Sequence, residues 1–169
     1  MTTENNTICS FPPLVGKNPQ LLILGSMPSV QSLTKARYYA HPRNHFWPLM
    51  AAVLGEDLPE DYPERLKMLT DHGVALWDSI GSCRREGSLD SAIRDVAPND
   101  ISGLLAAQPN IAAVACNGQR AQKELLQFHE IPPHVALLLL PSSSPVPRKG
   151  MVTLEDKLPH WQVLQEYVR

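Results

Sequence analysis

Four short runs of consecutive apolar residues recur along the chain, and each is bounded by polar residues, glycine or proline. The runs cover residues 21–24, 74–77, 111–116 and 135–140. Strands that are buried on both faces show such continuous runs, whereas strands with one exposed face alternate apolar and polar residues. The pattern therefore predicts a central four-stranded parallel sheet that is covered by helices.

Apolar residues at helical spacing lie between and beyond these runs. Phe46, Leu49 and Val53 form one stripe, and Pro48 falls in its first turn, where a missing N–H costs little. Similar stripes predict helices over residues 62–69, 101–105, 121–128 and 158–168. The alternation of strands and helices predicts an α/β protein, a three-layer α/β/α sandwich with right-handed crossovers.

The length and charge of the chain limit the function classes. A chain of 169 residues fits a single domain over residues 1–169. The net charge of −2 excludes a generally basic surface, so any binding of nucleic acid must depend on a local patch. A solvated surface is the alternative interpretation of the candidate cations, which are Lys35, Arg37, His41, Arg43, Arg148 and Lys149.

The cysteines and the termini give further expectations. Cys9, Cys83 and Cys116 are scattered without a CxxC spacing, so we expect no metal site, no cofactor and a reducing compartment. The first residues have neither a basic start nor an apolar stretch, which predicts no signal peptide. The apolar runs are too short to span a membrane, and we expect a cytoplasmic protein.

Two polar loops follow the first and the fourth predicted strands. The first covers residues 25–44 and contains small residues, two tyrosines, a histidine, an arginine and an asparagine. The second covers residues 141–150, and a turn at Asn117 lies at the end of the third strand. Open α/β sheets place their sites at the carboxyl ends of the strands. These loops are therefore suited to hold a phosphate, stack on a ring and align a water.

Several motifs resemble the uracil-DNA glycosylase superfamily, most closely its hypoxanthine (deoxyinosine) glycosylase branch. The resemblance spans most of the chain, with the order and spacing of the motifs kept. The block over residues 38–47 is the most specific of them. The matching segments are GSMP at 25–28, YYAHPRNHFW at 38–47, WD at 77–78, GSLDSAIR at 87–94, CNG at 116–118 and PSSSP at 141–145.

The chain departs from this superfamily in both main motifs. Mismatch-specific relatives carry an asparagine where this chain has Met27, and methionine does not hydrogen-bond a water usefully. The aspartate of the uracil-excising enzymes and the histidine of their second motif are also missing. In the hypoxanthine branch the asparagine of the HPRN block takes part in catalysis, and the resemblance places this role on Asn44.

The resemblance implies hydrolysis of the N-glycosidic bond of hypoxanthine in deoxyinosine that has been flipped out of DNA, leaving an abasic site. No lysine clearly favours Schiff-base chemistry, so we expect a monofunctional enzyme. Asn44 is neutral and a poor general base, but its carbonyl can accept a hydrogen bond from the attacking water and fix its direction. An N-cap of the following helix is the alternative role for Asn44, and the two roles are compatible.

The remaining site residues are also implied by the resemblance. Tyr39 matches an aromatic residue that stacks on the flipped base, whereas a core position is the more favoured reading for Tyr38. A tight strand-to-loop turn is the alternative for residues 25–27, and a simple loop is the alternative for residues 142–144. Bracing of the loop is the alternative for His41. The predicted base-binding residues are Gly25, Ser26, Met27, Tyr39 and Asn117. The predicted DNA-binding residues are His41, Arg43, Ser142, Ser143, Ser144, Val146, Pro147, Arg148 and Lys149.

Three alternative functions remain at this point. The enzyme could prefer uracil or xanthine, or the chain could be a non-catalytic module of the same fold that binds damaged DNA. A serine hydrolase that uses residues 142–144 is disfavoured, since the chain has no GxSxG elbow and no histidine assignable to a triad. We expect a monomer that associates with the nucleoid through DNA.

Overall fold

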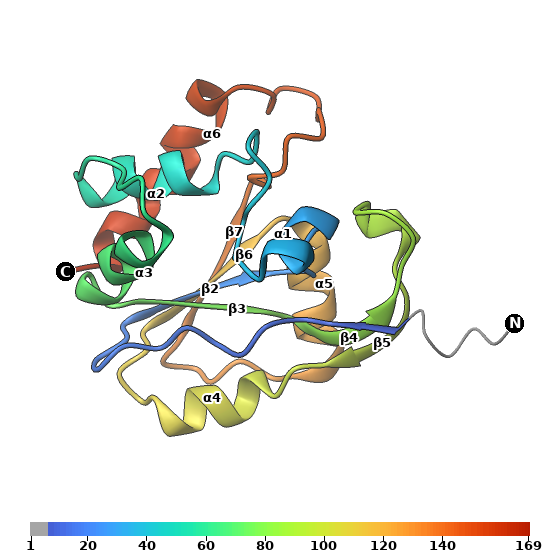
Figure 1. Ribbon diagram of the computed structural model, residues 1–169. Coiled ribbons are helices and arrows are strands. Elements are labelled where there is room, and N and C mark those ends of the chain that lie inside the picture. The colour runs from blue at the N-terminus through green and yellow to red at the C-terminus, as the bar shows by residue number, and fades with distance from the viewer. Residues whose placement is uncertain (1–6) are drawn as a thin grey trace, which may run out of the picture.

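A parallel sheet of four strands forms the centre of the molecule, as Figure 1 shows for the computed structural model. The structure describes residues 7–169; residues 1–6, from which the absence of a signal peptide was predicted, lie outside the described part. The strand order is β3-β2-β6-β7, and all neighbours are parallel. The predicted four-stranded parallel sheet is thus confirmed, with strands β2 (Leu21–Gly25), β3 (Val74–Asp78), β6 (Ala113–Asn117) and β7 (Ala136–Leu140).

Neighbouring residues of β2 point to opposite sides of the sheet, so both of its faces are apolar. Helices cover both faces. Leu21 and Ile23 pack in one apolar cluster, and Leu22 and Leu24 pack in another. The first cluster lies under α2 (Phe46–Leu54), α3 (Tyr62–Asp71) and α6 (Leu154–Trp161), and the second under α4 (Ile101–Ala107) and α5 (Gln119–Phe128). The predicted three-layer α/β/α sandwich is confirmed.

The last helix begins earlier than its apolar stripe predicts. Thr153 and Asp156 form a capping box, in which each side chain accepts a hydrogen bond from the other residue's N–H. Pro159 lies inside α6, and the chain continues as the 3-10 helix η3 (Gln162–Tyr167).

A second, antiparallel sheet was not predicted. Its strands are β1 (Thr7–Cys9), β4 (Ile80–Arg84) and β5 (Arg94–Pro98), in the order β1-β4-β5. Two short helices, α1 (Val30–Lys35) and η2 (Asp90–Ala92), were missed as well. Since β4 starts two residues after β3 ends, this sheet extends directly from the edge of the central sheet where the predicted site lies.

No helix within residues 7–169 is long and apolar enough to cross a membrane. The same residues contain no group of three or more histidine, cysteine, aspartate or glutamate side chains placed to hold a metal ion.

Candidate active site

The carboxyl ends of the four parallel strands bring three of the site residues to one edge. Gly25 ends β2 and pairs in register with Asp78, which ends β3. Asn117 ends β6 and pairs with Leu140 at the end of β7. The loops that follow β2 and β7 begin at this edge, as we predicted from the apolar runs.

Tyr39 occupies a strained position in the first loop. Its φ of 54° lies in the left-handed region, which non-glycine residues rarely adopt. Its ring stacks on Phe46, with 3.9 Å between the ring centroids and 16° between the planes. The hydroxyl is buried without a hydrogen-bond partner, and burial raises the pKa of Tyr39, so the phenol keeps its proton. Tyr38 beside it is a core residue whose hydroxyl donates to the Pro12 carbonyl.

Asn44 is half-buried at the start of α2 and lines a cleft of about 340 Å³. Its Oδ1 accepts a hydrogen bond of 2.9 Å from the N–H of Phe46, the first residue of α2, while His45 holds the N-cap position without a side-chain hydrogen bond. Asn44 therefore satisfies one N–H of the first turn from one residue before the N-cap position, and it also lines the cleft. Other residues that line the cleft are Tyr39, His41, Trp47, Tyr62 and Arg65.

Ser143 connects the second loop to the rest of the site. Its N–H donates to Asn117 Oδ1 over 2.8 Å, and its hydroxyl accepts from Asn117 Nδ2 over 2.9 Å. Its carbonyl accepts from the N–H of His45 over 2.9 Å, which joins this loop to the one before α2. Ser143 is buried and its polar groups are occupied, so it connects the two loops; its contact with DNA stays a prediction.

Lys157 of α6 also joins these two loops. Its Nζ donates to the Ser144 carbonyl and to His45 Nδ1, each over 3.0 Å. The side chain is buried, and desolvation, helped by the charge of Arg148, lowers the pKa of Lys157. Burial and the nearby Lys157 charge also lower the pKa of His45, which favours a neutral ring.

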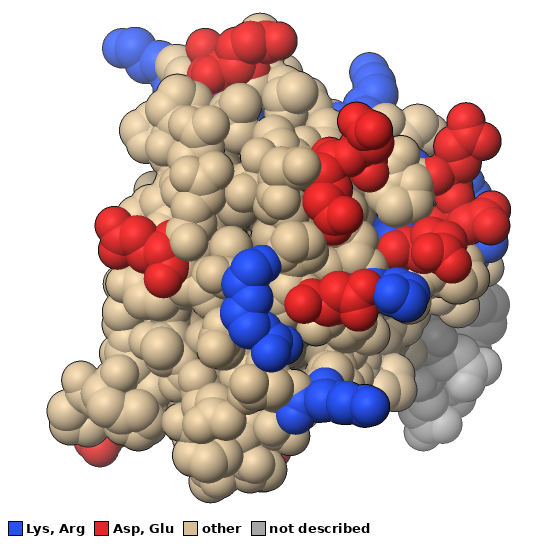
Figure 2. All heavy atoms as spheres, turned by 90° about the vertical axis from the view of Figure 1, so that its left-hand side faces the viewer, with Lys and Arg blue, Asp and Glu red and all other residues tan. Residues whose placement is uncertain are grey.

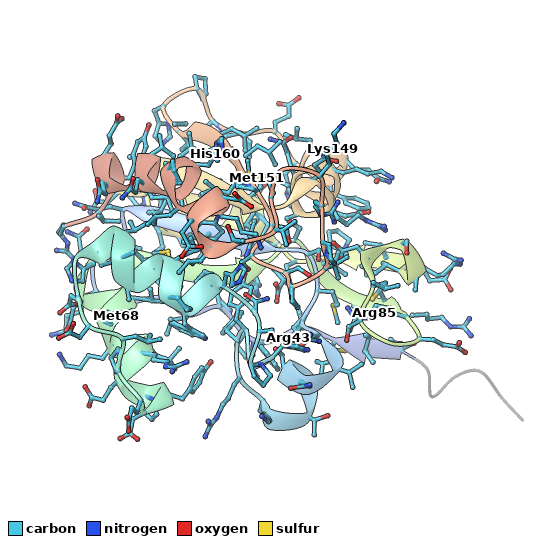
Figure 3. The ribbon with its side chains drawn as sticks, turned by 90° about the horizontal axis from the view of Figure 1, so that it is seen from above. Arg43, Met68, Arg85, Lys149, Met151 and His160 are labelled. Atoms are coloured by element: carbon cyan, nitrogen blue, oxygen red, sulfur yellow. The ribbon has the colours of Figure 1, made fainter. Side chains whose placement is uncertain are left out.

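The remaining predicted residues divide between the interior and the surface. The Ser26 hydroxyl donates to Asp90, and the Met27 side chain packs with Ile80 in a small apolar cluster, so both side chains are occupied. Figure 3 shows Arg43 on the loop before α2 and Lys149 on the loop after β7. The exposed residues of the two loops are Arg43, Val146, Pro147, Arg148 and Lys149, whereas His41, Ser142 and Ser144 are partly buried.

Asp78 belongs to the WD segment at 77–78 that carries part of the resemblance, but the sequence analysis gave it no role in the site. It is buried, with 3% of its surface exposed, and its Oδ2 has no hydrogen-bond partner. Burial, and next the charge of Asp90, raise the pKa of Asp78 to about 7, against the opposing effect of Arg85. Its place at the end of a strand adjacent to Gly25 was the available signal, but the order of strands is not visible in the sequence.

The face that carries α2 and α3 has no concentration of positive charge. Figure 2 shows Lys and Arg side chains beside Asp and Glu on this face, and uncharged residues cover most of it. This distribution agrees with the net charge of −2 and leaves the loops at the sheet edge as the candidate surface for a polyanion.

The fold and the site define an α/β protein with a cleft of small-molecule size, which is lined by the segment between α1 and α2 and by the starts of α2 and α3. A family model of the uracil DNA glycosylase superfamily matches residues 12–165. A solution structure from Methanosarcina acetivorans, described as a uracil DNA glycosylase, has a TM-score of 0.79 and 33% sequence identity, and the match covers 94% of this chain and 96% of the other.

Two curated relatives extend the likeness to one branch. A hypoxanthine DNA glycosylase of Methanosarcina barkeri is 40% identical over 112 residues, which are 66% of this chain and 71% of the relative. A hypoxanthine DNA glycosylase of Methanosarcina acetivorans is 41% identical over the same shares of both chains. The chain belongs to the uracil DNA glycosylase superfamily and is a DNA glycosylase, as its motifs predicted.

Proposed function

We propose that this protein removes hypoxanthine from deoxyinosine in DNA by hydrolysis of the N-glycosidic bond, leaving an abasic site. The observation that carries the proposal is that Asn44 and Tyr39 line one cleft. An enzyme in which one residue positions the water and the other stacks on the base needs both in the same cleft. The names of the two relatives support hypoxanthine as the base.

In this mechanism the flipped base stacks against Tyr39, which is held on its other side by Phe46. Such stacking is worth about 1–3 kcal/mol per base. Because Asn44 is anchored by its hydrogen bond to the Phe46 N–H, its amide has a fixed direction and can orient a water toward the anomeric carbon. Asn44 acts by positioning, since an amide does not take up the proton of the water.

The exposed loop after β7 completes the proposed interface with DNA. Val146 is 43% exposed, and it can fill the space that the flipped nucleotide leaves in the duplex. Arg148 and Lys149 can attract the phosphates, which makes binding weaker at higher salt concentration.

The identity of the base is tested with duplexes that each contain hypoxanthine, uracil, xanthine or adenine at one position. The enzyme is in excess, and alkaline cleavage reveals the abasic sites. We expect the fastest excision with hypoxanthine. A preference for uracil would assign the chain to another specificity, and binding without any abasic product would make it a DNA-binding module.

The role of Asn44 is tested with Asn44→Ala and Asn44→Ser. Serine restores an acceptor for the helix cap, so it should recover the thermal stability that alanine loses, about 1 kcal/mol. We expect both variants to excise hypoxanthine on the order of 10²-fold more slowly than the wild type while still binding DNA. Asn110→Ala, at an exposed asparagine, is the matched control. If Asn44→Ser regains the wild-type rate, the cap alone explains the effect.

A further inference from the structure

Three buried side-chain polar atoms within residues 7–169 have no hydrogen-bond partner, and they belong to Tyr39, Asp78 and Arg85. Buried polar atoms are nearly always paired, because leaving one unpaired costs free energy. Asp78 and Tyr39 lie against Gly25 at the end of β2, and Arg85 contacts the loop that follows this strand. A Cβ atom on Gly25 would stand 2.6 Å from Asp78 Oδ1 and 2.9 Å from the Tyr39 hydroxyl. Arg85 donates through Nη2 to the Pro28 carbonyl over 2.6 Å.

Gly25 therefore lets the end of β2 pack closely against the carboxyl of Asp78 and the hydroxyl of Tyr39. The Cβ of any other residue would clash with both groups. Asn117 is near enough to influence the pKa of Tyr39, but its amide is bonded to Ser143 and the Tyr39 hydroxyl has no hydrogen-bond partner. The unpaired oxygens of Asp78 and Tyr39 thus belong to residues packed against Gly25, and both Gly25 and Tyr39 are predicted base-binding residues.

We propose that the carboxyl of Asp78 is the proton donor to the departing base. This inference rests on the proposed function. It supplies a proton donor for the leaving base, a role that Asn44 does not fill. When the bond between C1′ and the base nitrogen breaks, the electron pair moves onto the purine ring. A purine leaves more readily when a ring nitrogen accepts a proton at the same time.

The proton balance of the step is closed by solvent. The carboxylic acid of Asp78 gives its proton to a ring nitrogen of the purine, so neutral hypoxanthine leaves and a carboxylate remains. The water oriented by Asn44 forms a bond to C1′ and loses one proton to solvent. Asp78 takes up a proton from solvent as the products leave, which returns the enzyme to its starting state.

The charges around Asp78 allow its neutral form at physiological pH. Asp90 of η2 is the nearest group of like charge and disfavours ionisation, whereas Arg85 after β4 opposes it. Tyr38 and Tyr39 face it from the loop before α2, and both remain protonated because burial raises the pKa of each phenol.

The helix α5 contributes two opposite charges that form an ion pair with each other. Its Arg120 and Glu124 are 2.8 Å apart, and Arg120 also donates to the Asp90 carbonyl. The pKa of about 7 for Asp78 agrees with a group that donates a proton near neutral pH. A carboxylic acid kept neutral by its surroundings is an established way to donate a hydrogen bond at pH 7.

The test measures the single-turnover rate of hypoxanthine excision from pH 5.5 to 9 with saturating enzyme, for the wild type and for Asp78→Asn. The wild-type rate should fall about tenfold per pH unit above about pH 7. Asp78→Asn keeps the shape of the side chain but has no proton to donate. Its rate should be about 10²–10⁴-fold lower at pH 6, without the same fall above pH 7.

Two further variants separate the role of Asp78 from general effects. Tyr39→Phe removes the hydroxyl but should keep the fall in rate above pH 7. Asp71→Asn removes an exposed carboxylate that pairs with Lys67 on α3, and it should behave as the wild type. Ionisation of the base itself would lower the rates of the wild type and of Asp78→Asn alike. The difference between the two pH profiles therefore reports Asp78 alone.

A wild-type rate that rises with pH through 7 would overturn the proposal and give the Asp78 carboxylate an accepting role. Equal rates for the wild type and Asp78→Asn would overturn it too. If Asp78→Asn does not fold, the wild-type profile still decides by its direction. If the wild type excises no hypoxanthine at any pH, the proposed function fails; if only the Asp78 effects are missing, this inference alone fails.

Discussion

The buried carboxyl of Asp78 should lower the stability of the folded protein as the pH rises. In the unfolded chain this group ionises near its usual pKa of 3.8, whereas in the folded protein the pKa is about 7. Between these values the unfolded state releases the proton and the folded state keeps it. The contribution of Asp78 to stability is therefore complete below pH 4 and is lost as the pH rises to about 7.

The size of this effect follows from the difference of about three between the two pKa values. Each unit corresponds to 1.36 kcal/mol, so the loss reaches about 4 kcal/mol above pH 7. Asp78→Asn has no such proton. Its free energy of unfolding relative to the wild type should therefore increase by roughly 2–3 kcal/mol between pH 5 and pH 8.

Urea unfolding of both proteins at pH 5, 6, 7 and 8, followed by tryptophan fluorescence, measures this difference. The change with pH matters more than the value at any one pH, because the constant effect of exchanging oxygen for an amide cancels. In thermal unfolding the same trend should raise the relative Tm of Asp78→Asn by about 5–10 °C. Asp71→Asn should show no comparable trend. A free-energy difference between the wild type and Asp78→Asn that stays constant from pH 5 to pH 8 would show that Asp78 is ionised in the folded protein.

Two further predictions concern the packing around this carboxyl. Gly25→Ala places a methyl group 2.6 Å from Asp78 and 2.9 Å from the Tyr39 hydroxyl. It should therefore lower the free energy of unfolding in urea by about 1–3 kcal/mol and slow the excision of hypoxanthine. An unchanged excision rate would mean that Asp78 and Tyr39 move aside freely. Asn117→Ala leaves the buried N–H and hydroxyl of Ser143 unpaired and should cost about 1–3 kcal/mol for each group. In a double-mutant cycle, Ser143→Ala should cost much less in the Asn117→Ala background than in the wild type, and strictly additive effects would contradict the pairing.

The central sheet could be predicted because its strands appear as continuous apolar runs, although only β2 and β6 are buried throughout and the edge strand β7 is partly exposed. The antiparallel sheet could not: β4 and β5 are as long as the central strands, but they are partly exposed, and residues such as Gly81 and Arg84 break any apolar pattern. The helix α1 has six residues and little apolar surface to bury, and its Val30 is 47% exposed. Local sequence is a weak guide to elements that are stabilised mainly by their neighbours.

The same limit applies within the site. Gly25, Tyr39 and Asn117 were predicted to lie together because parallel strands end at one edge, and the structure brings them together. The burial of Ser143 could not be foreseen, because it depends on a partner 26 residues away in a loop of polar composition. Asp78 was overlooked for a related reason, since its importance comes from its place next to Gly25.

The attachment of the loop after β7 has a mechanical consequence. Ser143 and Ser144 are held from two sides, by Asn117 and by Lys157, while the residues from Val146 to Gly150 extend beyond these anchors without burial. In the proposed complex with DNA, bending of that tip would stop at the anchors and leave the geometry of the interior undisturbed. Substitutions in the tip should therefore change how the protein meets DNA without changing the chemistry behind it.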